Sequence, residues 1–317
     1  MTEVTKETKA SSTLANRHIK EENPDTKYVV YANDLKHKST RSVNPHMADW
    51  DDDNVKERFG KDFDTITSRL KESKLNGFSQ LDFSRLKLEK FPNLENYKHY
   101  NELTTKLQYL FLNDNKLTKC DDRIKPFANI EVLDISFNFI TEITYLPKYL
   151  KEFVCHTNEI TSLPDHQYIT KIDCSSNKIT KVGNYENLRD LICNDNKLIE
   201  IPSYECLKRL ICKVNPIVKI GCQPSLTHLD CSSTNVLGHI GQFDILTNLI
   251  CNHTKTTDIS KFQKLETLEI MGCTMQIPFI RTLKCLMCED YENLDISSRY
   301  KVEKEITEQK NSCILFC

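Results

Sequence analysis

The sequence predicts an α/β solenoid, a right-handed superhelix whose turns place one parallel β-sheet on the concave side. Two observations carry this prediction. An apolar template of fixed length recurs along most of the chain, and an Asn stands at one fixed place in six successive copies. No single copy can bury its own apolar residues, so neighbouring copies have to stack over a shared core. The short return path of each copy predicts mostly extended or 3₁₀ backbone on the convex side.

The overall composition argues against several classes of function. The chain has 317 residues, a formal net charge of -2, 39 % hydrophobic residues and 28 % charged residues. Such a balance offers no broad basic field for nucleic acid or anionic lipid, and no run of about 18 apolar residues suits a membrane span. The first residues lack the apolar stretch of a secretory signal. We therefore expect a cytoplasmic protein that binds neither nucleic acid nor membranes.

The template reads apolar-x-x-apolar-x-apolar-x-x-Asn-x-apolar-x-x-apolar. The copies that begin at Leu150 and Leu188 match at every apolar position, and most copies are 19 or 20 residues apart. The alternation apolar-x-apolar places both apolar side chains on one face of a short strand. The copies begin at Leu107, Ile130, Leu150, Ile169, Leu188, Leu207, Leu226, Leu246, Leu265 and Ile280, after an outlying first copy from Phe78.

These residues resemble the repeats of leucine-rich repeat proteins. The short period, with Pro164 and Pro202 closing two of the copies, is similar to compact bacterial-type repeats. It is also similar to uncharacterised leucine-rich repeat proteins of large amoebal DNA viruses. The resemblance covers residues 78–290 and implies a concave sheet that binds partners. It names no partner, because the family is a scaffold for many functions.

The Asn of each copy is expected to stabilise the turn that follows the strand. Its amide offers donors and an acceptor to buried backbone groups that leave the sheet, which we favour over a role in ligand contact. The six residues are Asn115, Asn138, Asn158, Asn177, Asn196 and Asn215. The position then becomes Thr234, Thr254, Cys273 and Cys288. These replacements bond less completely and predict a less regular C-terminal half.

Half of the 14 cysteines fall at the third apolar position of the template. Because a free thiol packs as a small hydrophobic group, these residues are expected to form a buried column. Disulfides within the column are an alternative, although parallel side chains suit the disulfide dihedral poorly. The seven residues are Cys155, Cys174, Cys193, Cys212, Cys231, Cys251 and Cys285.

Two further interpretations of the cysteines remain open. Cys285 and Cys288 form a CxxC with Cys273 in the preceding copy, which suits zinc, but no second CxxC accompanies it. Cys288 and Asp290 resemble the catalytic Cys-x-Asp of bacterial repeat proteins that carry a ubiquitin-ligase domain. That motif belongs to a separate helical domain, for which few residues remain here. We expect no catalytic residue, no metal and no cofactor.

The residues between core positions are expected to face outward on the concave surface. The central outward positions are Asp82, Phe111, Asp134, Val154, Asp173, Ile192, Ile211, Asp230, Ile250, Glu269 and Lys284, and four polar residues that flank them are His156, Asn194, Lys213 and Asn252. Acidic groups outnumber basic ones, and the apolar members predict a protein-binding surface. The candidate partner-binding residues are Phe111, Asp134, Val154, His156, Asp173, Ile192, Asn194, Ile211, Lys213, Asp230, Ile250 and Asn252. The alternative is that β-branched residues simply favour strands.

Four segments are predicted along the chain: a polar, flexible stretch at 1–48, an amphipathic helical cap at 49–77, the repeat domain of about 11 repeats at 78–290, and a C-terminal cap or tail at 291–317. The cap contains a helix predicted over 54–74, with Asn54 and Glu57 as a capping box. Its apolar stripe consists of Val55, Phe59, Phe63, Ile66 and Leu70. A second helix is predicted at 93–107, and Trp50 is expected to pack near the cap.

The function predicted from the sequence is that of a non-catalytic protein-protein interaction scaffold. Its partner is a protein or peptide bound on the concave face. One alternative is a structural or packaged component of a virus particle, suggested by composition alone. A second alternative is the substrate-recognition part of a ubiquitin-ligase-type effector.

Overall fold

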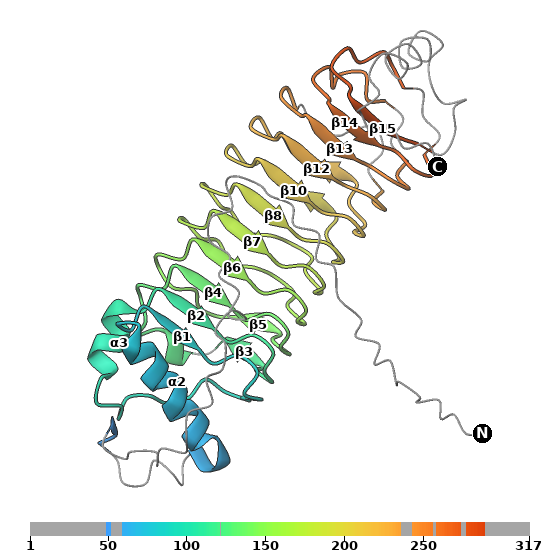
Figure 1. Ribbon diagram of the computed structural model, residues 1–317. Coiled ribbons are helices and arrows are strands. Elements are labelled where there is room, and N and C mark those ends of the chain that lie inside the picture. Colours follow the sequence, from blue (N-terminus) through green and yellow to red (C-terminus); the bar gives the residue numbers. More distant parts are fainter. Residues whose placement is uncertain are drawn as a thin grey trace, which may run out of the picture. The chain divides into compact units, whose positions relative to one another are not determined.

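The computed structural model describes residues 49–51, 59–120, 122–235, 243–255, 258–273 and 277–288. All described residues belong to one compact unit, Pro45–Cys317. Within that unit the chain winds into a stack of similar turns (Figure 1). The solenoid predicted from the repeats is confirmed.

One parallel sheet runs along the stack. Every strand has three residues with a buried residue at its centre, and each pairs in register with the strand of the next turn. The eleven strands, in sheet order, are β1 (Gln80–Asp82), β2 (Tyr109–Phe111), β4 (Val132–Asp134), β6 (Glu152–Val154), β7 (Lys171–Asp173), β8 (Asp190–Ile192), β10 (Arg209–Ile211), β12 (His228–Asp230), β13 (Asn248–Ile250), β14 (Thr267–Glu269) and β15 (Cys285–Met287). One step across the sheet therefore equals one repeat.

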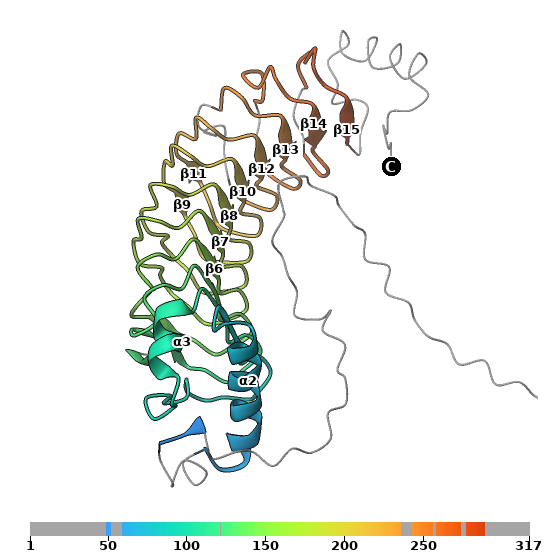
Figure 2. The same cartoon turned by 60° about the vertical axis from the view of Figure 1, so that its left-hand side comes forward.

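The return segments opposite the sheet are mainly extended. Two short parallel pairs occur there, β3 (Lys119–Cys120) with β5 (Glu142–Ile143) and β9 (Glu200–Ile201) with β11 (Lys219–Ile220). The 3₁₀ helix η4 (Asp122–Ile124) follows β3. Figure 2 shows β9 and β11 on the outer side of the curve and the strands of the large sheet on the inner side. The predicted convex side is confirmed, and the large sheet forms the concave face.

A helical segment lies beside the first strand. The 3₁₀ helix η3 (Gly60–Asp62) leads into α2 (Phe63–Leu75), which packs next to β1 (Figure 1). The side chains of the predicted stripe that this helix buries are Phe63, Ile66 and Leu70. Val55 and the predicted capping pair, Asn54 and Glu57, lie outside the described residues.

The second helix is shorter than the sequence predicts. Apolar spacing predicts a helix over 93–107, but α3 spans only Tyr100–Lys106. At its expected start, the Oδ1 atom of Asn93 accepts a hydrogen bond from the backbone N–H of Glu95 at 3.0 Å. Local bonding of this kind competes with helix formation, so the segment before α3 is a turn.

Trp50 joins this turn to the first helix. Its ring centroid lies 6.1 Å from that of Phe63 and 5.5 Å from that of Tyr97. The indole Nε1 donates a hydrogen bond to the Oγ1 atom of Thr67 in α2 at 3.2 Å. The expectation that Trp50 packs near the cap is therefore confirmed.

The six Asn residues form the predicted ladder of side-chain hydrogen bonds. Asn196 shows the pattern: its Nδ2 donates to the carbonyl of Cys193 in its own turn at 3.2 Å and to that of Cys174 in the preceding turn at 3.0 Å. Its Oδ1 accepts the backbone N–H of Ile179 in the preceding turn at 2.9 Å. Each Asn thus closes its own turn and binds it to the turn before.

A residue in the left-handed conformation precedes each site of this ladder. Val214, before Asn215, has a φ of 55°, and Phe137, before Asn138, has a φ of 52°. A β-branched residue rarely adopts that conformation, and each such residue costs on the order of 1 kcal/mol or more. Because the side-chain amide then bonds the backbone groups of the sharp turn, the ladder offsets this strain.

The ladder becomes simpler in the last turns. Thr234 and Thr254 each donate through Oγ1 to the carbonyl of the residue three positions earlier, at 2.7 and 2.8 Å. The Sγ atom of Cys273 donates to the carbonyl of Cys251 at 3.0 Å. A hydroxyl or thiol has one donor hydrogen where an amide has two, so fewer bonds can cross between turns at these positions.

The cysteine column is buried as predicted, with one correction at its end. Cys193 and Cys212 are fully buried, and neither forms a disulfide. In the last strand, Leu286 pairs with Leu268, which places Cys288 and not Cys285 at the third apolar position. The last copy therefore begins at Leu283, three residues after the predicted Ile280.

The Asn177→Ala variant is expected to lose about 1 to 3 kcal/mol of the free energy of unfolding. Its Nδ2 bonds the carbonyls of Cys155 and Cys174, and its Oδ1 accepts the N–H of Ile160, at 3.0 to 3.1 Å. Removal leaves these groups unpaired in a buried turn. Urea unfolding followed by circular dichroism measures the loss.

Asn184→Ala is the matched control, because Asn184 is an exposed amide in the following return segment. Equal midpoints for both variants would contradict the assigned role of the ladder.

Candidate functional site

The concave face is organised by one row of half-buried residues, which we name the central row. Each member follows the buried centre of its strand and points away from the core. The row consists of Asp82, Phe111, Asp134, Val154, Asp173, Ile192, Ile211, Asp230, Ile250, Glu269 and Met287. It contains every residue predicted for it except Lys284, which the shifted start of the last copy replaces with Met287.

The flanking polar residues lie two positions farther along the chain, where each strand ends. His156, Asn194 and Asn252 are half-buried there, and Lys213 is exposed. The ring of His156 also meets that of Phe137 edge-on, at 4.9 Å between centroids. The sequence-predicted candidates therefore share one surface.

Sequence reasoning missed a second role for the acidic members of the central row. The Oδ1 atom of Asp134 accepts hydrogen bonds from the backbone N–H of Ser136 at 2.9 Å and from its hydroxyl at 2.6 Å. The same Asp-Ser pair recurs at Asp173 with Ser175, at Asp230 with Ser232 and, through the backbone N–H alone, at Asp82 with Ser84. These carboxylates cap the strand ends. Asp-x-Ser at one template position was the signal in the sequence.

The apolar members of the row lack this capping partner. Two residues after Val154, Ile192, Ile211 and Ile250 the chain has His, Asn, Lys and Asn, whereas the four turns with Asp in the row have Ser there. Ile192 and Ile211 are register partners on β8 and β10, so they form one apolar step at the middle of the face. Beside them, the Oδ1 atom of Asn194 is buried and has no hydrogen-bond partner among the described residues.

A second row on the concave face consists of the first residue of each strand. From β6 to β10 the charges in this row alternate in sign. The Nζ atom of Lys171 lies 2.6 Å from the Oε1 atom of Glu152, and Asp190, Arg209 and His228 follow on successive strands. Opposite charges on neighbouring strands favour the observed register. Burial and the nearby Arg209 lower the pKa of His228. This row therefore carries little net charge.

The central row is more acidic than the row formed by the first residues of the strands. Burial raises the pKa of Asp134, although the two bonds from Ser136 and the nearby His156 act in the opposite direction. The carboxylate is thus partly desolvated while its own turn satisfies only one of its oxygens. A partner that brings positive charge would compensate this cost.

Comparison with protein families identifies the repeats. A family model described as "Leucine Rich repeats (2 copies)" matches residues 105–148. The repeats are leucine-rich repeats. A comparison of the sequence with curated proteins gave no match.

Solved leucine-rich repeat structures share this fold. The leucine-rich effector protein YopM of Yersinia pestis is 19 % identical, with a TM-score of 0.62 over 75 % of this chain and 67 % of that chain. A chain of the LRIM1/APL1C complex is 17 % identical, with a TM-score of 0.53 over 71 % of this chain and 54 % of that chain. The APL1 leucine-rich repeat domain is 19 % identical, with a TM-score of 0.52, over 63 % and 58 %. The chain spans little more than half the length of the last two.

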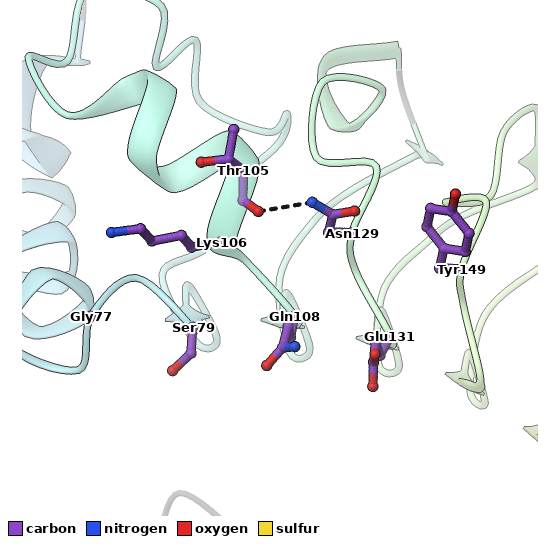
Figure 3. A pocket seen from close by; sticks show the side chains of 8 residues that line it. All are labelled: Gly77, Ser79, Thr105, Lys106, Gln108, Asn129, Glu131 and Tyr149. Carbon is purple, nitrogen blue, oxygen red and sulfur yellow. Dashed lines mark hydrogen bonds between the residues drawn. The ribbon is translucent and has the colours of Figure 1, made fainter.

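A pocket of about 410 Å³ lies at the N-terminal ends of the first strands of the sheet (Figure 3). Its polar groups are largely engaged within the protein: Asn129 donates to the carbonyl of Thr105 at 2.8 Å, and Glu131 pairs with Lys151 at 2.8 Å. Tyr149 lies at one end (Figure 3). We interpret it as a surface groove. The residues that line it are Gly77, Ser79, Thr105, Lys106, Gln108, Asn129, Glu131 and Tyr149.

The geometry of the last leucine-rich repeat bears on the metal and ligase interpretations. Cys285 begins β15 and is half-buried, whereas Cys288 follows the last residue of that strand and, at an odd spacing, faces the opposite side. Cys288 is buried in the core column, whereas Asp290 lies outside the described residues. Within the described residues, no group of three or more His, Cys, Asp or Glu side chains is placed to hold a metal ion. In the same part of the chain, no helix has the length and hydrophobicity to span a bilayer.

The column thiols are expected to resist alkylation in the native protein. Burial raises the pKa of both Cys193 and Cys212 well above the ordinary thiol range, which removes the reactive thiolate. At pH 8.5, iodoacetamide should label them about 100-fold more slowly than the exposed Cys206. Peptide mass spectrometry measures the rates. Labelling of all three at one rate would show that the column opens readily.

Proposed function

We propose that this leucine-rich repeat protein is a non-catalytic scaffold that binds a protein or peptide on its concave face. The observation that carries the proposal is the apolar step of Ile192 and Ile211. Four other turns place Asp-Ser pairs at the same strand ends, so the fold does not require isoleucine there. Apolar residues that face outward beside polar ones are typical of a binding surface.

The fold supports this assignment. Leucine-rich repeat solenoids present extended concave surfaces, and most act as binding scaffolds. Among the similar structures, one protein is described as an effector, and another structure is that of the LRIM1/APL1C complex. We extend only binding of a protein partner to this chain. We further propose that it acts in the cytoplasm without a cofactor and without binding nucleic acid or membranes.

The double variant Ile192→Asp/Ile211→Asp is expected to lose most of the partner captured by the wild-type chain. Two carboxylates introduced into an apolar contact would have to be desolvated on binding, which is costly without partners of opposite charge. Affinity capture from cytoplasmic extract, followed by quantitative mass spectrometry, measures the loss. Circular dichroism checks that the variant is folded.

Ile199→Asp/Val218→Asp is the matched control. These residues belong to the same two turns, are 59 % and 46 % exposed, and lie past the strand ends, outside the central row. The control should capture the wild-type set of proteins. If the concave variant captured that set as well, the proposed function would be wrong.

A further inference from the structure

Two carboxylates bracket the apolar step on the concave face. Asp173 on β7 precedes Ile192 and Ile211 in the central row, and Asp230 on β12 follows them. The strand order β7-β8-β10-β12 makes these four residues consecutive members of the row. The pattern along the sheet is therefore acidic, apolar, apolar, acidic.

Each of these carboxylates has an oxygen that its own turn does not use. The Oδ1 atom of Asp173 accepts both bonds from Ser175, and that of Asp230 accepts both from Ser232. Within the described residues, no Lys, Arg or His forms an ion pair with either Asp. Since both residues are half-buried, a cation brought by a partner would meet a partly desolvated carboxylate, where ionic interactions are stronger than in water.

We call the four residues from Asp173 to Asp230 in the central row the bracket. The distance between its two carboxylates favours one backbone conformation of the partner. Three strand steps separate the two Asp residues by about 14.4 Å. In an extended chain, residues i, i+2 and i+4 share one face and span about 13.6 Å. An α-helix repeats its facing residues at about 10.5 or 16.5 Å, and a polyproline helix repeats at about 9.3 Å. The extended chain fits the bracket best.

We propose that the partner presents an extended segment with two cationic residues four positions apart and an apolar residue midway between them. The cations lie over Asp173 and Asp230, and the apolar residue lies on the step of Ile192 and Ile211. This inference rests on the proposed function of the concave face and adds the chemistry of what binds there.

The surrounding charges agree with this arrangement. The exposed Lys213 beside Ile211 repels a cation at the middle of the bracket and so favours an apolar residue there. On the other side of the central row, Lys171, Asp190 and Arg209 alternate in sign and have a formal sum of +1. Asp173 and Asp230 are the acidic groups of the central row on these four strands.

Fluorescence anisotropy with short labelled peptides tests the proposal. The probe has Arg-Thr-Leu-Thr-Arg at its centre, with neutral flanks. One comparison peptide, Arg-Leu-Thr-Thr-Arg, moves the apolar residue to the other face, and a second, Arg-Thr-Leu-Arg, shortens the distance between the cations. The probe should bind the wild-type protein about 10-fold more tightly than either comparison peptide, and added salt should weaken its binding.

The chain supplies a matched control for the carboxylates. Asp173→Asn/Asp230→Asn keeps an oxygen for each Ser cap but removes both charges, and it should weaken binding of the probe about 10-fold or more. Asp82→Asn/Glu269→Gln removes two carboxylates of the central row that lie outside the bracket and outside the candidate partner-binding residues, and it should leave the affinity unchanged. Equal losses in both variants would point to general charge attraction and overturn the proposal.

Other results separate this inference from the proposed function. If all three peptides bind equally, or none binds at protein concentrations up to about 0.5 mM, the assigned chemistry is wrong. The concave face remains a binding surface in that case, provided that Ile192→Asp/Ile211→Asp still loses the captured protein. If that variant captures the full set, both proposals are wrong.

Discussion

The fold depends on one interaction, the side-chain amide that closes each turn after the strand. A sharp turn with a left-handed residue, such as Asp195 before Asn196, takes backbone groups out of the sheet while they remain buried. Because Asn196 bonds carbonyls in its own turn and in the preceding one, a single side chain closes the turn and stacks it. Strand register follows from this coupling. Since register fixes which residues share a face, the rows of the concave surface are a consequence of the ladder.

The turns of the concave face differ in whether their central-row residue caps the end of its strand. Where Asp stands in the central row, its Oδ1 caps the following Ser, as Asp173 does for Ser175. Where Ile stands there, as at 192 and 211, the strand end lacks this cap and the side chain is available for contact. Acidic charge on the surface therefore has a structural origin at every Asp of the row. A central-row position that lacks the Asp-Ser pair therefore indicates a binding role more directly than the acidity of the row does.

Much of the fold could be predicted from the sequence because every core position recurs at a fixed spacing. The errors arose where two local rules competed. Ile277, Ile280, Leu283 and Leu286 are each three residues apart, so the start of the last copy could not be chosen from spacing, and only pairing with β14 decides it. The predicted helix at 93–107 was too long because the Asn93 side chain forms a turn. The candidate residues were placed on the correct face, yet spacing cannot separate an isoleucine that favours a strand from one that contacts a partner.

If a partner is recognised by the distance between Asp173 and Asp230, the strands that carry them have to keep fixed positions. The bracket from Asp173 to Asp230 spans turns whose ends are closed by Asn177, Asn196 and Asn215, with Thr234 after the last strand. Three of the four turns therefore carry amide bonds between neighbours, and the rows there are fixed before any partner arrives. Preorganisation of this kind lowers the entropic cost of binding and penalises a partner whose cations are misplaced by one residue. In the proposed recognition, the Asn ladder therefore contributes to specificity by fixing the spacing of the residues on the concave face.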